Sequence, residues 1–163
     1  MAEPRPRFNA DIAKLAAAEI ADDLVAQRLI GASARNGAIE DIAKHAGSRD
    51  DGYTIAKALD SYCSWDCDFR IAEVLDGFGS ACDGFIGQAE KDWAARTNPQ
   101  PPLPIGARIK MSRGRFGIVD GISSHNTASY AVKVEGDVHC DAPTNSRWIV
   151  RFEDAVEAEM ETV

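Results

Sequence analysis

The sequence predicts an α+β chain in which an N-terminal helical bundle is followed by a small β-barrel. Apolar residues recur at helical spacing up to about residue 96 and shift towards a period of two after residue 104. Between these regions, residues 97–104 contain four prolines, which predicts a stiff, extended connector. We therefore expect an acidic helical domain over 1–96, a proline-rich linker over 97–104, the barrel over 105–154 and an acidic tail over 155–163.

Capping residues and glycines divide the helical region. Asn9 or Asp11 can cap a first helix that runs to about Ala34, where Asn36-Gly37 stops it. Further helices are expected over 39–46, over 53–62, from a cap at Ser64, Asp66 or Asp68 to about Leu75, and from Asp83 to Trp93. Gly77 and Gly79 are expected to separate the last two of these helices.

The residue pattern of the C-terminal region predicts β-strands. Alternating apolar residues favour four of them, over 105–111, 114–122, 129–135 and 147–152, with glycines where turns or bulges are needed. Residues 153–163 contain five acids and no base. We expect the end of this acidic tail to fray.

Composition restricts the classes of function. The 163 residues are 45% hydrophobic, so a packed core needs no metal or disulfide to hold it. The net charge of −8 disfavours a general nucleic-acid coat protein. Apolar runs are too short to cross a bilayer, and four cysteines make no disulfide framework, so we expect a reducing, cytoplasmic setting without membrane partners. No phosphate loop, nucleophile elbow or His-Glu-x-x-His motif is present, so an enzyme is not favoured and no cofactor is expected.

The charge is unevenly distributed. Residues 101–152 carry a net +3, whereas residues 50–92 contain ten acids against three bases. Such a run is typical of a solvated helix surface, but it also suits a face that docks on a basic protein, such as one that normally holds nucleic acid. The candidate residues for this acidic face are Asp60, Asp66, Asp68 and Asp76.

Residues 38–60 resemble the helix-turn-helix domains of the lac-repressor family. Ile42-Ala43-Lys44-His45-Ala46-Gly47 corresponds to the first helix and its turn, and residues 53–60 fill the place of the recognition helix. The turn at 48–52 is about two residues longer than in that family. It also places Asp50 and Asp51 where a recognition helix approaches phosphates, which opposes DNA binding.

The C-terminal region resembles the Src-homology, Tudor and KOW-like small barrels. The resemblance is carried by four segments, 104–109, 114–119, 130–134 and 148–154. It implies an SH3-like β-barrel that binds peptides, modified side chains or nucleic acid between its loops. The candidate binding residues are Arg113, Arg115 and Trp148, because an aromatic ring with nearby arginines suits both stacked bases and protein hot spots.

The cysteines offer a weaker candidate site. Cys63 and Cys67 are four apart, Cys82 follows fifteen later, and His139-Cys140 lies in the β region. Structural zinc usually requires tighter pairs, so buried free thiols are the favoured interpretation and a metal site stays open.

The favoured hypothesis is a non-enzymatic protein that binds a larger, basic protein through the acidic face, the barrel surface or both. By analogy of size and charge, it could be a mobile-element-encoded inhibitor of a host nuclease or defence complex. The alternative is a nucleic-acid-associated regulator that binds through the barrel or the helix-turn-helix-like element. An enzyme is the third hypothesis, with Asp66, Asp68 and His139 as its candidate residues. A homodimer through the alanine-rich face of the first helix is also considered.

Overall fold

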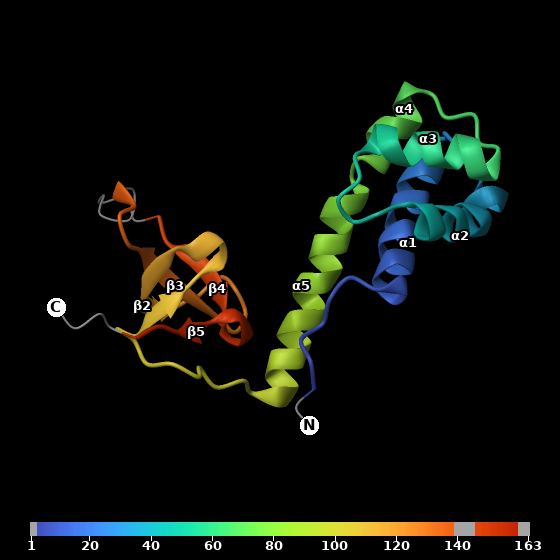
Figure 1. Cartoon of the computed structure of the whole chain (residues 1–163). Helices are drawn as coiled ribbons and strands as arrows, with labels where there is room; N and C mark the ends of the chain where they lie inside the picture. Colours follow the sequence, from blue (N-terminus) through green and yellow to red (C-terminus); the bar gives the residue numbers. More distant parts are fainter. Residues whose placement is uncertain (1–2, 139–145, 160–163) are drawn as a thin grey trace. The chain divides into compact units, whose positions relative to one another are not determined.

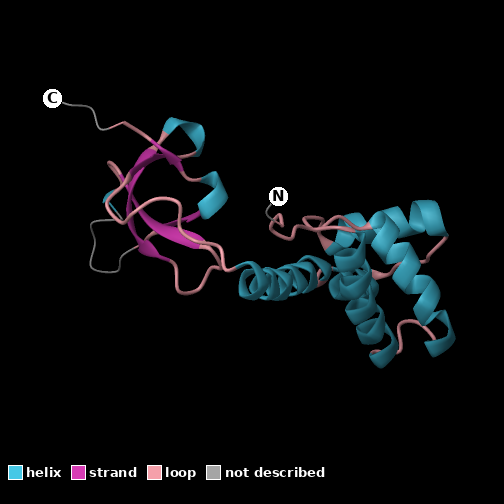
Figure 2. Cartoon of the chain, turned by 90° about the horizontal axis from the view of Figure 1, so that it is seen from below, coloured by secondary structure: helices cyan, strands magenta, loops and turns pink. Residues whose placement is uncertain are grey.

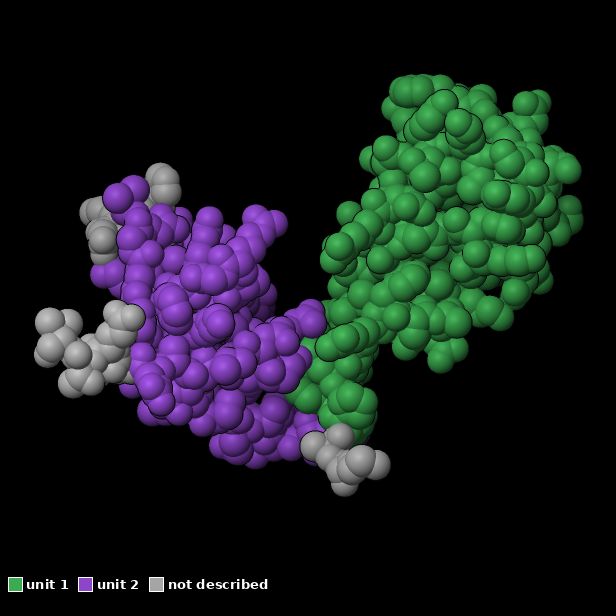
Figure 3. Space-filling view, in the orientation of Figure 1, with its two compact units in different colours: residues 1–93 green, residues 94–163 purple. Residues whose placement is uncertain are grey.

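The computed structural model describes residues 3–138 and 146–159. The chain divides into two compact units, residues 1–93 and residues 94–163, which Figure 3 colours separately. The first unit is built of helices and the second of an antiparallel sheet, so the α+β expectation is confirmed.

The helical unit contains α1 to α5 (Figure 1). Their bounds are Ala10–Ala26 for α1, Arg35–His45 for α2, Gly52–Cys63 for α3, Phe69–Leu75 for α4 and Phe78–Thr97 for α5, whose last residues belong to the second unit. Three N-caps use asparagine or aspartate side chains, at Asn9, Asp51 and Asp68.

The first helix is shorter than the sequence indicates. It ends at Ala26 because Arg28 adopts a left-handed conformation with a φ of 57°. The amide of Leu29 then donates to the carbonyl oxygen of Leu24 at 2.9 Å, which turns the chain back over the end of the helix. Leu29 and Ile30, expected to be helical, instead pack against the core from a loop.

The last helix begins earlier than expected, at Phe78 instead of Asp83. Gly77 and Gly79 were expected to act as stops, yet Gly79 lies inside the helix. A Cβ on Gly79 would lie 3.0 Å from the carbonyl oxygen of Ser48. The glycine therefore permits a close approach between α5 and the loop before α3, while the side chain of Phe78 is fully buried.

The core of this unit lies mainly between α1 and its neighbours. Its largest fully buried side chains are Leu24, Ile42, Ile55, Leu59, Leu75 and Phe78. Ala16, Ala17 and Ala21 are fully buried in the same core. The alanine-rich face of α1 thus packs inside its own unit, and the dimer expected through that face is not supported.

The second unit is a five-stranded antiparallel sheet with the order β4-β3-β2-β1-β5, and it curls into a half-barrel (Figure 2). The strands are β1 Arg108–Lys110, β2 Phe116–Ile122, β3 Ser129–Val134, β4 Trp148–Arg151 and β5 Val156–Glu157. A register shift between Val119 and Gly121 marks a bulge in β2, where the strand bends.

The sheet extends past the boundary expected at residue 154. After β4, a 3₁₀ turn over Phe152–Asp154 leads into β5, which pairs with β1 so that Ile109 faces Glu157. The amide of Ala158 also donates to the carbonyl oxygen of Arg108 at 2.8 Å. The start of the expected acidic tail therefore forms an edge strand. Backbone groups of β1 that do not bond β2 provide its hydrogen-bond partners.

The inner face of the sheet carries a small core. Ile109, Val119, Tyr130 and Val132 are fully buried there, and the Tyr130 and Phe152 rings lie 4.6 Å apart. The Tyr130 hydroxyl donates to the carbonyl oxygen of Leu103 at 2.9 Å and accepts from the amide of Leu103 at 2.8 Å. The end of the expected linker is thereby fixed to the sheet.

Candidate functional site

Three of the four aspartates predicted to form an acidic face hold the backbone of the helical unit. Asp60 Oδ1 accepts from the amide of Cys67 at 2.9 Å, and Asp68 Oδ1 accepts from the amide of Ile71 at 3.0 Å. Asp76 Oδ1 accepts from the amide of Gly52, the first residue of α3, at 2.9 Å. Each carboxylate thus satisfies an amide at a helix start or in a loop, a role that the charge pattern alone does not reveal.

The four aspartates do not form one cluster. Asp60, Asp66 and Asp68 gather around the connection between α3 and α4, with Asp66 exposed. Asp76 bonds the opposite end of α3. A helix of 12 residues is roughly 18 Å long, so Asp76 belongs to a different part of the surface.

The connection between α3 and α4 is firmly held. Ser64 ends α3 in a left-handed conformation, and the indole Nε1 of Trp65 donates to Asp41 Oδ2 at 2.9 Å. Two large aromatic side chains flank the connection, Tyr62 and Phe69, and each is 75% exposed. The Tyr62 ring stacks on His45 at 5.2 Å. We call this surface the α3–α4 tip and define it by Asp60, Tyr62, Asp66, Asp68 and Phe69.

The capping bonds leave the negative charge in place. They join carboxylates to backbone amides, which carry no net charge, and none of these capping aspartates pairs with a lysine or arginine in the part of the chain that the structure describes. At Asp51, the bond from the Thr54 amide lowers the pKa of the carboxyl, so this group stays ionised to lower pH. The helical unit therefore keeps an acidic surface although its aspartates are engaged.

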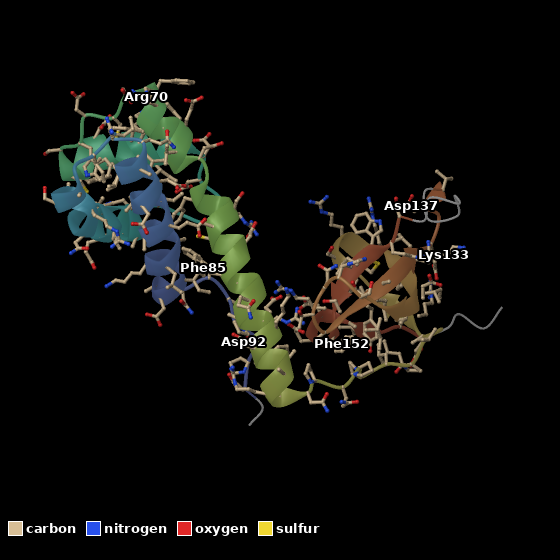
Figure 4. The ribbon with its side chains drawn as sticks, turned by 180° about the vertical axis from the view of Figure 1, so that it is seen from behind. Arg70, Phe85, Asp92, Lys133, Asp137 and Phe152 are labelled. Carbon is tan, nitrogen blue, oxygen red and sulfur yellow. The ribbon has the colours of Figure 1, made fainter. Side chains whose placement is uncertain are left out.

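A groove between α1 and α5 was not expected from the sequence. It has a volume of about 700 Å³. Its lining residues are Glu19, Ile20, Asp23, Gln27, Glu73, Val74, Gly77, Ser80, Ala81, Gly84, Phe85 and Gln88. Figure 4 labels Phe85, whose side chain lies between the two helices. The signal that could have revealed the groove is the set of small residues at 80, 81 and 84, which share a side of α5, with Gly77 in the turn just before it.

In the second unit, the structure brings together two of the three predicted residues. The Arg115 guanidinium lies 5.0 Å from the centre of the Trp148 ring, and the indole Nε1 donates to Asp137 Oδ2 at 3.2 Å. Trp148 remains 41% exposed. Arg113 is exposed in the turn before β2 and has a φ of 62°, but no contact joins it to this pair among the residues described. We call Arg115, Trp148 and Asp137 the Trp148 platform.

Other basic residues of the sheet are paired with acids. Arg108 donates to Glu135 from Nε at 2.8 Å and from Nη2 at 3.1 Å, and its guanidinium lies over the Phe116 ring. Arg108 lowers the pKa of the Glu135 carboxyl by hydrogen bonding to it. Arg147 Nε donates to Asp120 Oδ2 at 2.6 Å. The charges of Arg108 and Arg147 are therefore locally balanced by the acids beside them.

The described cysteines are free thiols. Burial raises the pKa of Cys67 to about 12 and that of Cys82 to about 11, so both carry a proton at neutral pH. No group of three or more metal-ligating side chains occurs among the residues described. His139 and Cys140, considered as metal ligands, lie outside the described residues.

The start of α3 carries two carboxylates where the helix-turn-helix resemblance would place DNA phosphates. Asp51 Oδ1 accepts from the Thr54 amide at 2.7 Å, and Asp76 accepts from the Gly52 amide. The amides that could receive a phosphate are thus already bonded to anions. This geometry opposes DNA reading by α3.

No family model, curated protein or solved structure matches the chain. None of the helices in the described part of the chain combines the length and hydropathy needed to cross a bilayer. We therefore base the proposed function on residue geometry and charge.

Proposed function

We propose that this chain is a non-enzymatic interaction protein whose helical unit binds a partner protein with a basic surface. One observation carries the proposal: the carboxylates of Asp51, Asp60, Asp68 and Asp76 bond neutral backbone amides, and all four residues are exposed, so their charge still faces outward. Complementary charge speeds and orients the encounter of two proteins.

The α3–α4 tip supports the proposal. Its acids stand beside Tyr62 and Phe69, two exposed aromatic side chains of the kind that anchor protein interfaces. The hydrogen bonds of Asp60, Trp65 and Asp68 fix the loop before a partner arrives. Preorganisation of this kind lowers the entropy lost on binding.

The charge also suggests the class of partner. A basic protein surface that normally holds nucleic acid offers the positive field that an acidic, rigid helical unit matches. Within this proposal, the chain competes with nucleic acid for that surface, as a mobile-element-encoded inhibitor of a host nuclease or defence complex would.

The proposal can be tested by removing charge without removing caps. The variant combines Asp60→Asn, Asp66→Asn, Asp68→Asn and Asp76→Asn. The amide oxygens introduced at positions 60, 68 and 76 can still accept the backbone bonds. The partner is first captured from a nuclease-treated host extract and purified, and its affinity for the full chain is then measured in low salt. We expect the variant to bind about tenfold more weakly or worse, mainly through a slower association rate.

A matched control removes the same charge from the other unit. It replaces Glu153, Glu157 and Glu159 by Gln and Asp154 by Asn. The proposal predicts that this control keeps its affinity within about twofold, because the charges it removes lie outside the helical unit that binds the partner. Equal losses in both variants, or no loss in the first, would overturn it.

We also infer that the second unit is an SH3-like barrel. The order β4-β3-β2-β1-β5, with a 3₁₀ turn before the last strand, supports the resemblance carried by residues 104–154. A fold of this class does not by itself assign a function.

The Trp148 platform favours a second candidate function, binding of single-stranded nucleic acid. An exposed indole with an arginine beside it suits a stacked base. If this function holds, Arg113→Ala with Arg115→Ala weakens oligonucleotide binding and flattens its dependence on salt. An unchanged salt slope would exclude it.

A further inference from the structure

We propose that the groove between α1 and α5 binds a basic, amphipathic helical segment of the partner protein. Apolar side chains of that segment would enter the groove, and its lysines or arginines would face the carboxylates of Glu19, Asp23 and Glu73. This inference rests on the proposed function and names the place and the chemistry of binding.

The groove has the size for such a segment. Its volume of about 700 Å³ falls within the range of pockets that bury whole ligands, and it can receive several side chains. It lies entirely within the helical unit, between residues 19 and 88.

The wall formed by α5 permits close approach. Ala81 and Gly84 present little side chain along it. A Cβ built on Gly84 meets no atom within 4 Å, so the space beside this glycine is open. A partner helix can therefore come near the α5 backbone, as helices do where small residues line their contact.

The lining residues suit a segment that is both amphipathic and positively charged. Ile20, Val74 and Phe85 supply apolar surface. Three carboxylates and no lysine, arginine or histidine accompany them among the lining residues. In contrast to the capping aspartates, the carboxylates of Glu19, Asp23 and Glu73 take no part in a backbone bond or ion pair among the described residues.

Charge complementarity decides between possible occupants. A second copy of the helical unit, an anionic lipid surface and nucleic acid would all bring negative charge to an acidic groove, which costs free energy. A segment with apolar residues on one face and basic residues beside them satisfies both parts of the lining. Helices recognised in grooves commonly use anchors at positions i, i+3 or i+4, and i+7.

The test uses the full chain and a defined probe. The probe is a fluorescent synthetic peptide of about 15 residues with leucines on one helical face and lysines on the other, a length that gives about four turns. A scrambled peptide of the same composition has the same charge but no apolar face. Binding is followed by fluorescence anisotropy at about 50 mM salt, where surface charges are only partly screened.

Two tryptophan variants of α5 give the matched pair. Gly84→Trp fills the groove, whereas Gly87→Trp adds the same side chain to the same helix outside the lining residues, and neither Cβ meets an atom within 4 Å. Circular dichroism spectra of both variants verify that the helices are retained.

The proposal predicts saturable binding of the amphipathic peptide by wild type and Gly87→Trp, with Gly84→Trp at least about tenfold weaker, or about 1.4 kcal/mol. The scrambled peptide should bind at least about tenfold more weakly than the amphipathic one. Equal binding of both peptides, or equal binding by the two tryptophan variants, would overturn the proposal that the groove is the binding site.

These outcomes separate the two proposals. If the captured partner loses affinity when Asp60, Asp66, Asp68 and Asp76 are replaced by Asn but not in Gly84→Trp, the groove is not the binding site. The acidic helical unit would then still bind the partner through another surface. If neither change affects the captured partner, the proposed function fails as well.

Discussion

The aspartates of the α3–α4 region and the arginines of the sheet unit bond different kinds of partner. In the helical unit, Asp60, Asp68 and Asp76 accept hydrogen bonds from backbone amides. In the sheet unit, Arg108 and Arg147 donate to the carboxylates of Glu135 and Asp120. The first kind of bond leaves each carboxylate without a counter-charge, whereas the second kind joins opposite charges. Ion pairs also occur in the helical unit, at Lys14–Glu40 and Arg35–Asp22, but they do not involve these three aspartates.

This difference shows why a charge count is an incomplete guide to a binding surface. Residues 50–92 have a net charge of −7 and residues 101–152 have +3, and ion pairs within a region do not change these sums. In the second region Arg108 and Arg147 each lie beside an acid, whereas the capping aspartates of the first region bond neutral amides. The comparison favours the helical unit as the side that meets a charged partner.

The largest effect is expected from a substitution that lowers the stability of the helical unit and leaves that of the sheet unit unchanged. A Cβ on Gly52 would lie 2.0 Å from the carbonyl oxygen of Ala72 and 2.7 Å from the amide nitrogen of Asp76. Gly52→Val should therefore destabilise the helical unit by about 3 kcal/mol or more, because backbone atoms must move to admit the side chain. Amide NMR spectra should lose the native peaks of the helices and keep those of the sheet.

A glycine with open space provides the control. No atom lies within 4 Å of a Cβ built on Gly87, so Gly87→Ala should stabilise α5 by up to about 1 kcal/mol. Loss of sheet peaks in Gly52→Val would show that the units do not fold separately.

The next effect concerns the tertiary cap at the start of α3. Asp76→Ala removes the acceptor for the Gly52 amide and should cost about 1 kcal/mol, whereas Asp76→Asn should cost only a fraction of that. Asp66→Ala, at an exposed position, should change stability by less than about 0.5 kcal/mol. Urea unfolding followed by circular dichroism measures all three. A cost for Asp66→Ala equal to that for Asp76→Ala would contradict the assigned roles.

A smaller effect is expected in the pH dependence of the helical unit. The Thr54 amide lowers the pKa of Asp51 in the folded chain, so this bond stabilises the fold fully above the ordinary aspartate pKa of about 3.9. The stabilisation is lost as pH falls through the lower, folded pKa. Wild type should therefore lose stability relative to Asp51→Asn, which keeps a cap but does not titrate, as pH falls from about 5 to about 2.5.

Urea midpoints of the two proteins across this range measure the difference. A difference that stays constant with pH would show that the Asp51 carboxylate contributes nothing beyond a neutral cap. Glu135, whose pKa is lowered by Arg108, provides the same comparison in the sheet unit through Glu135→Gln.

The smallest effect is expected at the Trp148 platform. Arg115→Ala removes a cation–π contact at an exposed ring and should cost about 0.5–1 kcal/mol. Arg113→Ala, in a turn with no contact to the ring among the described residues, should cost less. Trp fluorescence during thermal unfolding distinguishes them, and a larger cost for Arg113→Ala would contradict the geometry.

Much of the fold could be predicted from local signals. The caps at Asn9 and Asp68 and the strand over 129–134 lie where spacing and side-chain chemistry indicate. The errors occur where tertiary contacts override those signals. Gly79 is a close-approach residue inside α5, and β5 forms because β1 offers a partner for its backbone.

The candidate site was less predictable. The sequence shows that Asp60, Asp68 and Asp76 are acidic but not that each will bond an amide, because two of those partners come from other segments of the fold. The groove depends on residues 19–27 and 73–88, which only folding brings together. Arg115 and Trp148 are likewise joined by pairing of strands that are distant in the sequence.

The most direct test of the central claim compares two probes on the full chain. The amphipathic lysine–leucine peptide and a single-stranded DNA of about 20 nucleotides are titrated at about 50 mM salt. The account predicts that the peptide binds at least tenfold more tightly than the DNA, or about 1.4 kcal/mol, and that Gly84→Trp weakens its binding. Tighter binding of the DNA, lost on replacing Arg113 and Arg115 by Ala, would contradict the account and assign binding to the sheet unit.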